Sequence, residues 1–298
     1  MENLDINTLK KGGFMRQIQK GCFSVRLRTV AGEIKAEQLL KISEIAQEFG
    51  HGYIHLTARQ GIEIPFIHQN DFAAVKRKLA EAGLEPGVCG PRVRTVTACQ
   101  GDAICPSGLI DTTALAKELD ARYFGLDLPH KLKFGVTGCA HNCLKAEEND
   151  VGIRGGFRPC WLEEPCSFCS LCEQVCPAKA IAVDKKRRRL SFREDACTYC
   201  GKCAKSCPTG AWQGNSGYLV FVGGLFGNRT AIGRQVLPII SDQDKLFQVI
   251  DSVIKFYEQT AKPGERLRAT LERVGWDVLQ EACQDDEVIA GDREQAVI

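Results

Sequence analysis

Two cysteine motifs of the same spacing constrain this sequence more than any other feature. Each motif has three cysteines with two residues between neighbours, a fourth cysteine after three further residues, and then a proline. The first motif comprises Cys166, Cys169, Cys172 and Cys176, and the second comprises Cys197, Cys200, Cys203 and Cys207. Three thiolates at this spacing wrap three corners of a cubane iron–sulfur cluster, and the fourth cysteine binds the neighbouring cluster.

This crossed pattern predicts two [4Fe-4S] clusters in one small unit of the ferredoxin type. One cluster is assigned to Cys166, Cys169, Cys172 and Cys207, and the other to Cys176, Cys197, Cys200 and Cys203. The alternative is a pair of zinc knuckles, in which two CxxC pairs supply all four ligands. That alternative leaves the third cysteine of each motif without a purpose, so the spacing favours clusters. Such a unit transfers electrons and performs no chemistry by itself.

Sixteen cysteines in 298 residues also suggest a secreted disulfide scaffold. Two observations argue against it, because the first twenty residues are polar and the cysteines fall in tight runs. Thiolate ligands predict a reducing compartment, hence a cytoplasmic protein. The most apolar stretch, Tyr218 to Phe226, is about half as long as a membrane span requires. A net charge of +2 gives no sign of a nucleic-acid partner.

The rest of the chain predicts an α+β fold in which a small domain interrupts a larger one. Alternating and helical apolar patterns predict a β-α-β-β-α unit over residues 22–82. The expected strands are 22–30, 53–58, 62–67, 93–98, 131–137, 152–156 and 218–222. The expected helices are 36–49, 71–82, 111–123, 244–260 and 264–283, followed by an acidic tail from Gln284. Between 159 and 212 the composition changes to dense cysteine and loops, which indicates an inserted domain.

A second set of four cysteines has a different spacing. Cys99 and Cys105 follow one predicted strand, and Cys139 and Cys143 follow another. Four thiolates on two such loops can hold a third cubane cluster. The alternative is a chance grouping of buried cysteines.

The residues around the second pair resemble a known family. The run Thr137-Gly138-Cys139-Ala140-His141-Asn142-Cys143 is similar to the TGCxNxC signature of sirohaem-dependent sulfite and nitrite reductases. The other pair in that family has the spacing of Cys99 and Cys105. The resemblance implies a [4Fe-4S] cluster on these four cysteines, with Cys143 bridging to the sirohaem iron. Three [4Fe-4S] clusters and one sirohaem are therefore expected.

The resemblance extends over nearly the whole chain. The run from Ile54 to Gln60, which includes Thr57, looks like the family's strand with a substrate-facing arginine, here Arg59. Arg94, Lys131 and Lys133 stand where the family has its other substrate-facing cations. The family's glycine-rich loop over the cofactor is matched by Gly223, Gly224, Asn228 and Arg234. The implied fold is the sirohaem/[4Fe-4S] sulfite reductase half-fold, with domains at 1–87, 88–158, 159–212 and 213–298. Larger members carry two copies of the catalytic half, whereas this chain carries one.

These residue types suit the implied chemistry. Reducing sulfite to sulfide takes six electrons and several protons, and electrons come from a cofactor rather than from side chains. A small anion needs fixed cations, which also stabilise developing charge and supply protons. Taken alone, Arg59 is a plausible partner for a carboxylate, and the two lysines an ordinary solvent face. Sirohaem carries eight carboxylates, so basic and polar contacts are expected from Arg26, Arg28, Thr57, Gln60, Asn142 and Arg234.

Two other functions stay open at this level. One is reduction of nitrite to ammonia on the same cofactor, and the other is a non-catalytic electron-transfer subunit. No GxGxxG motif follows a predicted strand, so electrons are expected from a partner, either a flavoprotein or another iron–sulfur subunit, in an oligomer. The basic run Lys185 to Arg189 is consistent with a solvated hairpin tip or with a docking face for an acidic electron donor.

Overall fold

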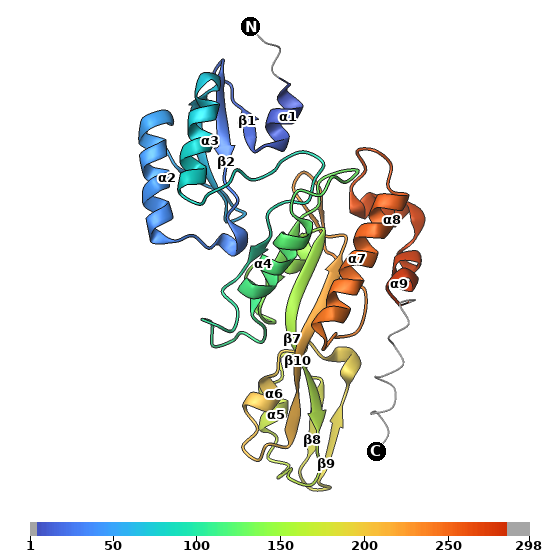
Figure 1. Cartoon of the computed structure of the whole chain (residues 1–298). Coiled ribbons are helices and arrows are strands. Elements are labelled where there is room, and N and C mark those ends of the chain that lie inside the picture. Colours follow the sequence, from blue (N-terminus) through green and yellow to red (C-terminus); the bar gives the residue numbers. More distant parts are fainter. Residues whose placement is uncertain (1–4, 285–298) are drawn as a thin grey trace.

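The computed structural model describes residues 5–284, which form two domains and a small insertion (Figure 1). The N-terminal domain contains a four-stranded antiparallel sheet in the order β1-β2-β4-β3. Its core joins apolar residues of that sheet to α2 and α3, as in Val25, Ile64, Ile42 and Val75. Its elements are α1 (Ile6–Lys11), β1 (Phe14–Arg16), β2 (Cys22–Arg26), α2 (Ala36–Phe49), β3 (His55–Leu56), β4 (Ile62–His68) and α3 (Phe72–Glu81), with 3-10 turns at Val30–Gly32 and Gln69–Asp71.

The larger domain is built on a five-stranded sheet in the order β13-β10-β7-β6-β5. Strands β5, β6 and β7 are parallel, whereas β10 and β13 are antiparallel additions. Helices α4 and α7 pack their apolar residues against this sheet in one continuous core. The strands are β5 (Thr97–Ala98), β6 (Phe134–Thr137), β7 (Val151–Trp161), β10 (Trp212–Val222) and β13 (Arg234–Gln235), with α4 (Thr112–Tyr123) and a 3-10 turn (Ala146–Glu148).

Two long strands connect this sheet to the inserted domain. β7 and β10 pair without interruption from Val151 opposite Val222 to Trp161 opposite Trp212. The insertion lies between them in sequence and at the far end of their ribbon in space (Figure 1). Its elements are α5 (Leu171–Val175), β8 (Ile181–Asp184), β9 (Arg189–Phe192), a 3-10 turn (Glu194–Ala196) and α6 (Lys202–Lys205).

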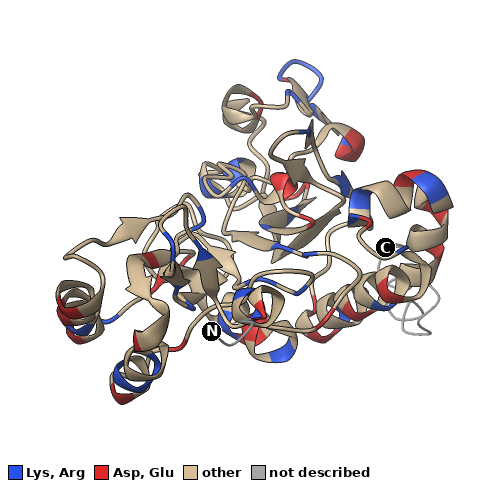
Figure 2. Cartoon of the chain, turned by 90° about the horizontal axis from the view of Figure 1, so that it is seen from above, with Lys and Arg blue, Asp and Glu red and all other residues tan. Residues whose placement is uncertain are grey.

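The C-terminal part returns to the larger domain. A short hairpin of β11 (Leu225–Phe226) and β12 (Thr230–Ala231) precedes β13, and three helices follow. These are α7 (Gln243–Thr260), α8 (Leu267–Val274) and α9 (Trp276–Gln284). Both signs of charge are spread over the outer helices (Figure 2). Within residues 5–284, no helix is both long and apolar enough to cross a membrane.

Most predicted elements are present, with some differences in extent. The helix 36–49 is found with those bounds, and the α+β class is confirmed. The helix expected over 264–283 is broken, because Gly275 has a φ of 119°, a value that ends α8. The strand 152–156 is longer than expected because its pairing with β10 continues into the insertion. Strands 93–98 and 53–58 are shorter than expected, since neighbouring strands pair with only two residues of each. The acidic tail from Gln284 lies almost entirely outside the described residues.

Candidate active site

A cavity of about 320 Å³ lies between the N-terminal domain and the central sheet. Its lining includes all four cations that sequence reasoning placed around the substrate, namely Arg59, Arg94, Lys131 and Lys133. Arg26 and Thr57 line it as well. None of the lining residues is Asp or Glu. The cavity is therefore strongly electropositive and has the chemistry of an anion site.

Arg59 reaches this cavity from the turn between β3 and β4. One guanidinium nitrogen donates to Asn149 Oδ1 at 2.6 Å, and the other donates to the carbonyls of Thr95 and Phe134 at 3.3 and 3.2 Å. Burial lowers the pKa of Arg59 to about 10, although the charge of Asp150 opposes this shift. The side chain is thus held rigidly by the walls of the cavity.

Arg94 is held in a similar way by main-chain carbonyls. It donates to Val88 O at 2.9 Å and to Gly90 O at 3.1 Å. Its Nε is buried and has no hydrogen-bond partner among the described residues. Burial lowers the pKa of Arg94, and nearby Arg26 and Arg266 act in the same direction. The main chain therefore anchors Arg94 in the wall of the cavity.

Lys131 and Lys133 differ from the arginines because their charged ends are not bound by protein. Their main-chain N–H groups donate to His130 Nδ1 at 2.7 Å and to Asp150 Oδ2 at 3.0 Å. No acceptor among residues 5–284 holds either ammonium group within bonding distance. Burial lowers the pKa of Lys133 to about 8, and neighbouring Arg59 contributes. Burial also lowers the pKa of Lys131, with Arg266 next in effect.

Asp150 is the buried carboxylate that balances these charges, and sequence reasoning missed it. It lies directly before β7 and is 1% exposed. Its Oδ1 accepts from Arg266 at 2.7 Å, and its negative charge raises the pKa of Arg59, Lys131 and Lys133 against the effect of burial. Arg266 is thus a further cation near the cavity, although it is not one of the lining residues. Its Nε is buried and has no partner among the described residues.

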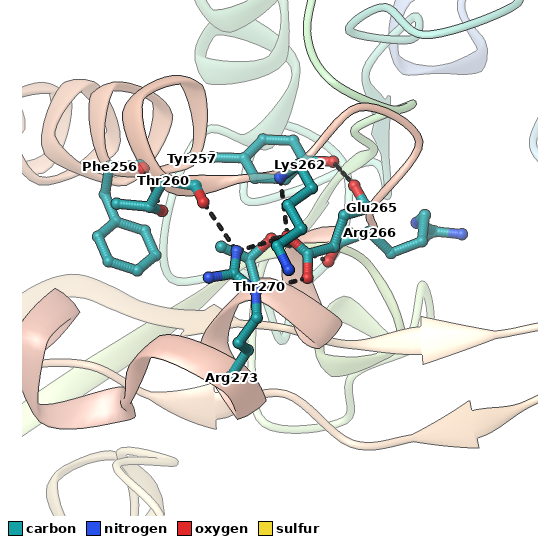
Figure 3. A network of polar contacts seen from close by, with 8 residues as sticks. All are labelled: Phe256, Tyr257, Thr260, Lys262, Glu265, Arg266, Thr270 and Arg273. Carbon is teal, nitrogen blue, oxygen red and sulfur yellow. Dashed lines mark hydrogen bonds and ion pairs between the residues drawn. The ribbon is translucent and has the colours of Figure 1, made fainter.

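A network of polar contacts fixes the turn that carries Arg266 (Figure 3). Glu265 accepts from Arg273 at 2.7 and 2.9 Å, from the main chain of Lys262 at 2.9 Å, and from Thr270 at 3.1 Å. Tyr257 donates to the carbonyl of Glu265 at 2.6 Å. The side chain of Arg266 extends away from these residues (Figure 3). The turn between α7 and α8 is therefore built to present one guanidinium to Asp150.

Asn149 is a second residue that sequence reasoning missed. It receives the hydrogen bond from Arg59, and its own amide donates to the carbonyls of Lys145 and Ala146 at 3.3 and 3.4 Å. Gly135 in β6 lies against it so closely that a Cβ there would be 2.2 Å from Asn149 Nδ2. The missing side chain of Gly135 is what makes room for Asn149. The sequence feature that could have pointed to this residue is the pair Asn149-Asp150 directly before a strand.

The two cysteine pairs outside the insertion follow the ends of parallel strands. Cys99 follows β5 and Cys139 follows β6, so both lie at the same edge of the sheet. The Cys99 thiol accepts from Gly138 N at 3.1 Å. Burial raises the pKa of Cys139, and the nearby thiols of Cys105, Cys99 and Cys143 act in the same direction. Cys139 thus lies near enough to the other three thiols to interact with them electrostatically.

The eight cysteines of the insertion surround two separate cavities. One cavity is lined by Cys166, Cys169, Cys172 and Cys207, and the other by Cys176, Cys197, Cys200 and Cys203. Main-chain N–H groups point at the sulfur atoms, as in Ala211 to Cys207 and Ala180 to Cys176, each at 3.3 Å. Burial raises the pKa of the Cys172 thiol, and a contact with the indole N–H of Trp212, which lines the same cavity, opposes that shift. The twelve motif cysteines form no disulfides.

Several residues expected to contact the cofactor also have protein partners. Arg28 does not line the cavity, because it is paired with Asp120 at 2.7 Å and Glu85 at 2.8 Å. Arg26 lines the cavity but is also bonded to Glu63 at 2.7 Å. Gln60 exchanges two hydrogen bonds with the main chain of Ala98, at 2.8 and 3.1 Å. Asn142 bonds Glu147 and accepts from Ala146 N at 2.9 Å. The last two side chains position the cysteine loops.

The glycine-rich segment lies away from the cationic cavity. Gly224 packs on the main chain beside the cysteine loop, since a Cβ there would be 2.2 Å from Glu147 O. Gly223 has a φ of 78° and touches Trp276, whose ring also lies under Arg234 at 4.4 Å. Asn228 is exposed in the turn of the β11–β12 hairpin. None of these four residues lines the cavity described above.

Comparison with known families covers nearly the whole chain. Residues 89–289 match the family described as "Nitrite and sulphite reductase 4Fe-4S domain". Residues 15–82 match the "Nitrite/Sulfite reductase ferredoxin-like half domain".

Curated relatives carry related names. A coenzyme F420-dependent sulfite reductase of Methanocaldococcus jannaschii is 36% identical over 268 residues, which cover 89% of this chain and 43% of that protein. The chain thus spans less than half the length of that relative. One subunit of the anaerobic sulfite reductase of Salmonella typhimurium is 31% identical over 280 residues, covering 86% of this chain and 82% of that protein. The large subunit of the NADH nitrite reductase of Escherichia coli is 39% identical, but only over 47% of this chain and 17% of that protein.

Solved structures show the same fold. Dissimilatory sulfite reductase I matches with a TM-score of 0.71 and 20% identity over 88% of this chain and 69% of that one. NirA of Mycobacterium tuberculosis matches with a TM-score of 0.66 and 17% identity over 95% of this chain and 47% of that one. The family matches, the relatives and the shared fold agree with the resemblance seen in the cysteine motifs, and the chain belongs to the nitrite and sulfite reductase family.

Proposed function

We propose that the chain is the catalytic subunit of a sulfite reductase, which reduces sulfite to sulfide. The observation that carries this proposal is the single cavity lined by Arg59, Arg94, Lys131 and Lys133 and free of lining carboxylates. In the overall reaction, sulfite takes up six electrons and seven protons and releases hydrosulfide and three waters. Each departing oxygen needs protons, and the two unbound ammonium groups are suitable donors.

The residues present fit the cofactors that the family implies. Three separate groups of four thiols fit three [4Fe-4S] clusters, and the N–H groups aimed at sulfur suit cluster sulfurs as well as thiolates. The unpartnered Nε atoms of Arg94 and Arg266 and the free ammonium groups fit an anionic ligand or the carboxylates of sirohaem. When bound, sirohaem supplies an iron at which sulfite is reduced. Cys143, which is exposed at the end of its loop, is the residue proposed to reach it.

The arrangement also supports an order for electron transfer. The thiols of Cys176, Cys197, Cys200 and Cys203 lie next to the larger domain, since Phe157 of β7 donates to Tyr199 O at 2.8 Å. Lys205 of α6 donates to Pro106 O at 3.2 Å, directly beside Cys105. We therefore place the group held by Cys166, Cys169, Cys172 and Cys207 at the outer end of the route. Electrons would enter there from a partner subunit.

Sulfite is favoured over nitrite by the extent of the similarities. The sulfite reductase relatives align over 86% and 89% of the chain, insertion included, whereas the nitrite reductase aligns over 47%. The test is a direct comparison on protein purified without oxygen, with reduced methyl viologen as electron source. Sulfide formation should exceed ammonia formation from nitrite at equal substrate concentration. A chain that consumes neither anion, yet carries its clusters, would be an electron-transfer subunit instead.

Iron content tests the thiol assignment separately from activity. We expect about twelve cluster irons and one haem iron per chain, with a sirohaem absorbance band. Replacing Cys207 with Ala should remove about four irons and leave the haem band. Cys160→Ala is the matched control, because that exposed cysteine lies outside every motif. Zinc in place of iron, or iron for only two clusters, would contradict the proposal.

A further inference from the structure

The β8–β9 hairpin of the insertion carries the most concentrated charge in the sequence. Its strands pair from Ile181 opposite Phe192 to Asp184 opposite Arg189. The tip and the first residue of β9 are Lys185, Lys186, Arg187, Arg188 and Arg189, all exposed. The hairpin lies at the end of the molecule that is furthest from β1 and the N-terminal domain (Figure 1).

These five cations have very little counter-charge nearby. Asp184 is the one carboxylate within residues 5–284 that pairs with any of them, at 3.8 Å from Arg187. Its other oxygen is already used by the main-chain N–H groups of Lys186 and Arg187, at 3.0 Å each. Elsewhere, surface cations on helices face carboxylates one turn away, as Arg122 faces Glu118 and Arg268 faces Glu272. The outer helices accordingly show both colours in Figure 2.

The hairpin also forms a wall of the outer cysteine cavity. Val183 of β8 and Leu190 of β9 line that cavity together with Cys166, Cys169, Cys172 and Cys207. The guanidinium carbon of Arg188 lies 4.9 Å from the ring centroid of Phe168, between Cys166 and Cys169 in sequence. Cys169 itself is exposed. The basic tip therefore lies directly beside a thiol group that has an exposed member.

Like charges gathered at one exposed site repel each other and contribute nothing to the core of the small domain. Their placement makes sense if an acidic surface approaches there. Opposite charges at the rim of a transient interface speed and orient the encounter more than they strengthen it. An orienting field is what a short electron path from protein to protein requires.

We infer that the β8–β9 hairpin is the docking site for an electron-carrier protein with an acidic face, which delivers electrons to the group held by Cys166, Cys169, Cys172 and Cys207. In each encounter the carrier loses one electron and the chain's outer group gains it. This inference rests on the proposed function for the destination of the electrons, and it adds the place and the charge of the partner.

The test uses the anaerobically purified holoprotein and a small acidic [4Fe-4S] ferredoxin, reduced before mixing, as the carrier. The variant is Lys185→Glu with Lys186→Glu, which leaves Arg188 on Phe168. The matched control is Arg16→Glu with Lys20→Glu, which changes the charge equally on two exposed cations of the distant N-terminal domain. The measurement is the rate constant for bleaching of the chain's iron–sulfur absorbance, at several salt concentrations, with the ferredoxin in catalytic amount and kept reduced by NADPH and an excess of ferredoxin–NADP reductase, so that the carrier's own absorbance stays constant. Reduction by methyl viologen radical provides a carrier-independent reference.

At low salt, reduction of the hairpin variant by ferredoxin should slow by about tenfold and lose its salt dependence. The control variant should behave like the unmodified protein, and viologen should reduce all three proteins at equal rates. An equal loss in the control, no loss in the hairpin variant, or a parallel loss with viologen would each overturn the inference. Normal reduction by ferredoxin in a protein that reduces no sulfite would instead refute the proposed function and leave the docking site standing.

Discussion

Arg266 and Asp150 are 116 positions apart in sequence and meet at 2.7 Å beside the cationic cavity. The same carboxylate accepts the main-chain N–H of Lys133 at 3.0 Å. One buried negative charge thus joins the turn before α8 to the segment that carries both unbound lysines. A buried carboxylate among cations lowers the cost of their mutual repulsion and keeps them protonated.

The first prediction concerns Asp150→Asn, which keeps the shape and removes the charge. In the unmodified protein the pKa of Lys133 is about 8, and the Asp150 carboxylate holds it above the value that burial alone would give. Without the carboxylate, Lys133 loses its proton at a lower pH, so the basic limb of kcat/KM for sulfite should move to lower pH. The measurement is the pH profile with reduced viologen.

Stability gives a second measurement on the same variant. Loss of the charge leaves Arg266 without its buried partner, so the free energy of unfolding should fall by about 3 kcal/mol. Asp244→Asn, an exposed carboxylate at the start of α7, is the control and should change neither property. A basic limb that stays in place in a folded Asp150→Asn protein would mean that Asp150 does not act on Lys133.

A second prediction separates the lysines from the arginines of the cavity. Lys133→Met should lower sulfite turnover by about 100-fold, as loss of a single transition-state donor does elsewhere. It should not lower the melting temperature, because the ammonium group is desolvated and has no partner in the part of the chain that the structure describes. Arg59→Met should lower both sulfite turnover and the melting temperature, since Asn149 and two carbonyls would lose their donor.

The readouts are kcat for sulfite and the thermal midpoint, with Lys255→Met on the exposed side of α7 as control. Equal destabilisation by the two cavity substitutions would show that Lys133 is a structural residue. An unchanged kcat in Lys133→Met would remove it from the substrate site.

The cysteine positions could be predicted from sequence because cluster geometry fixes ligand spacing over a few residues. Cys207 groups with Cys166 in the cavity, although 41 positions separate them along the chain, because the motif itself encodes the crossing. The four cavity cations could also be identified from the sequence, since each stands next to a motif or a strand end. Strand lengths were harder to predict, because the ends of β3 and β5 are set by their pairing partners and not by the local sequence pattern.

There is a physical reason why the residues that support the cavity cations could not be predicted from the sequence. Arg266 and Asp150 are brought together by the packing of α7 on the sheet, and no local pattern records that contact. Arg28 and Gln60 were assigned to the cofactor by type and position. The fold supplies Asp120 for the first and the main chain of Ala98 for the second. A basic or amide side chain near a motif is ambiguous until its neighbours are known.

A third prediction uses the contact between Gly135 and Asn149. Gly135→Ala places a methyl group 2.2 Å from Asn149 Nδ2, so Asn149 must move and its bond to Arg59 must weaken. We expect a higher KM for sulfite with a smaller change in kcat, because Arg59 is displaced and not removed. Gly12→Ala is the control, since the nearest atoms to a Cβ there are 3.6 Å away. An unchanged KM in a folded Gly135→Ala protein would show that Asn149 does not position Arg59.

The last prediction concerns the network that aims Arg266. Glu265 has a pKa of about 2, because Arg273 and the main chain of Lys262 stabilise its charge. A carboxylate with a lowered pKa stabilises the fold at every pH above its ordinary value and loses that effect only as pH falls toward 2. The contact with Arg273 therefore persists throughout the range in which the enzyme is assayed. Glu265→Gln should loosen the turn, move Arg266 and raise the KM for sulfite.

That increase should be present throughout the range from about pH 5 to 9, because Glu265, with a pKa of about 2, stays charged there. Asp150→Asn should instead have an effect that grows with pH, so the two variants are distinguished by their profiles. The measurement is KM across that range, with Glu258→Gln on the exposed face of α7 as control. A KM change that appeared only at one end of the range would show that Glu265 acts by titration, and the positioning role of the network would be wrong.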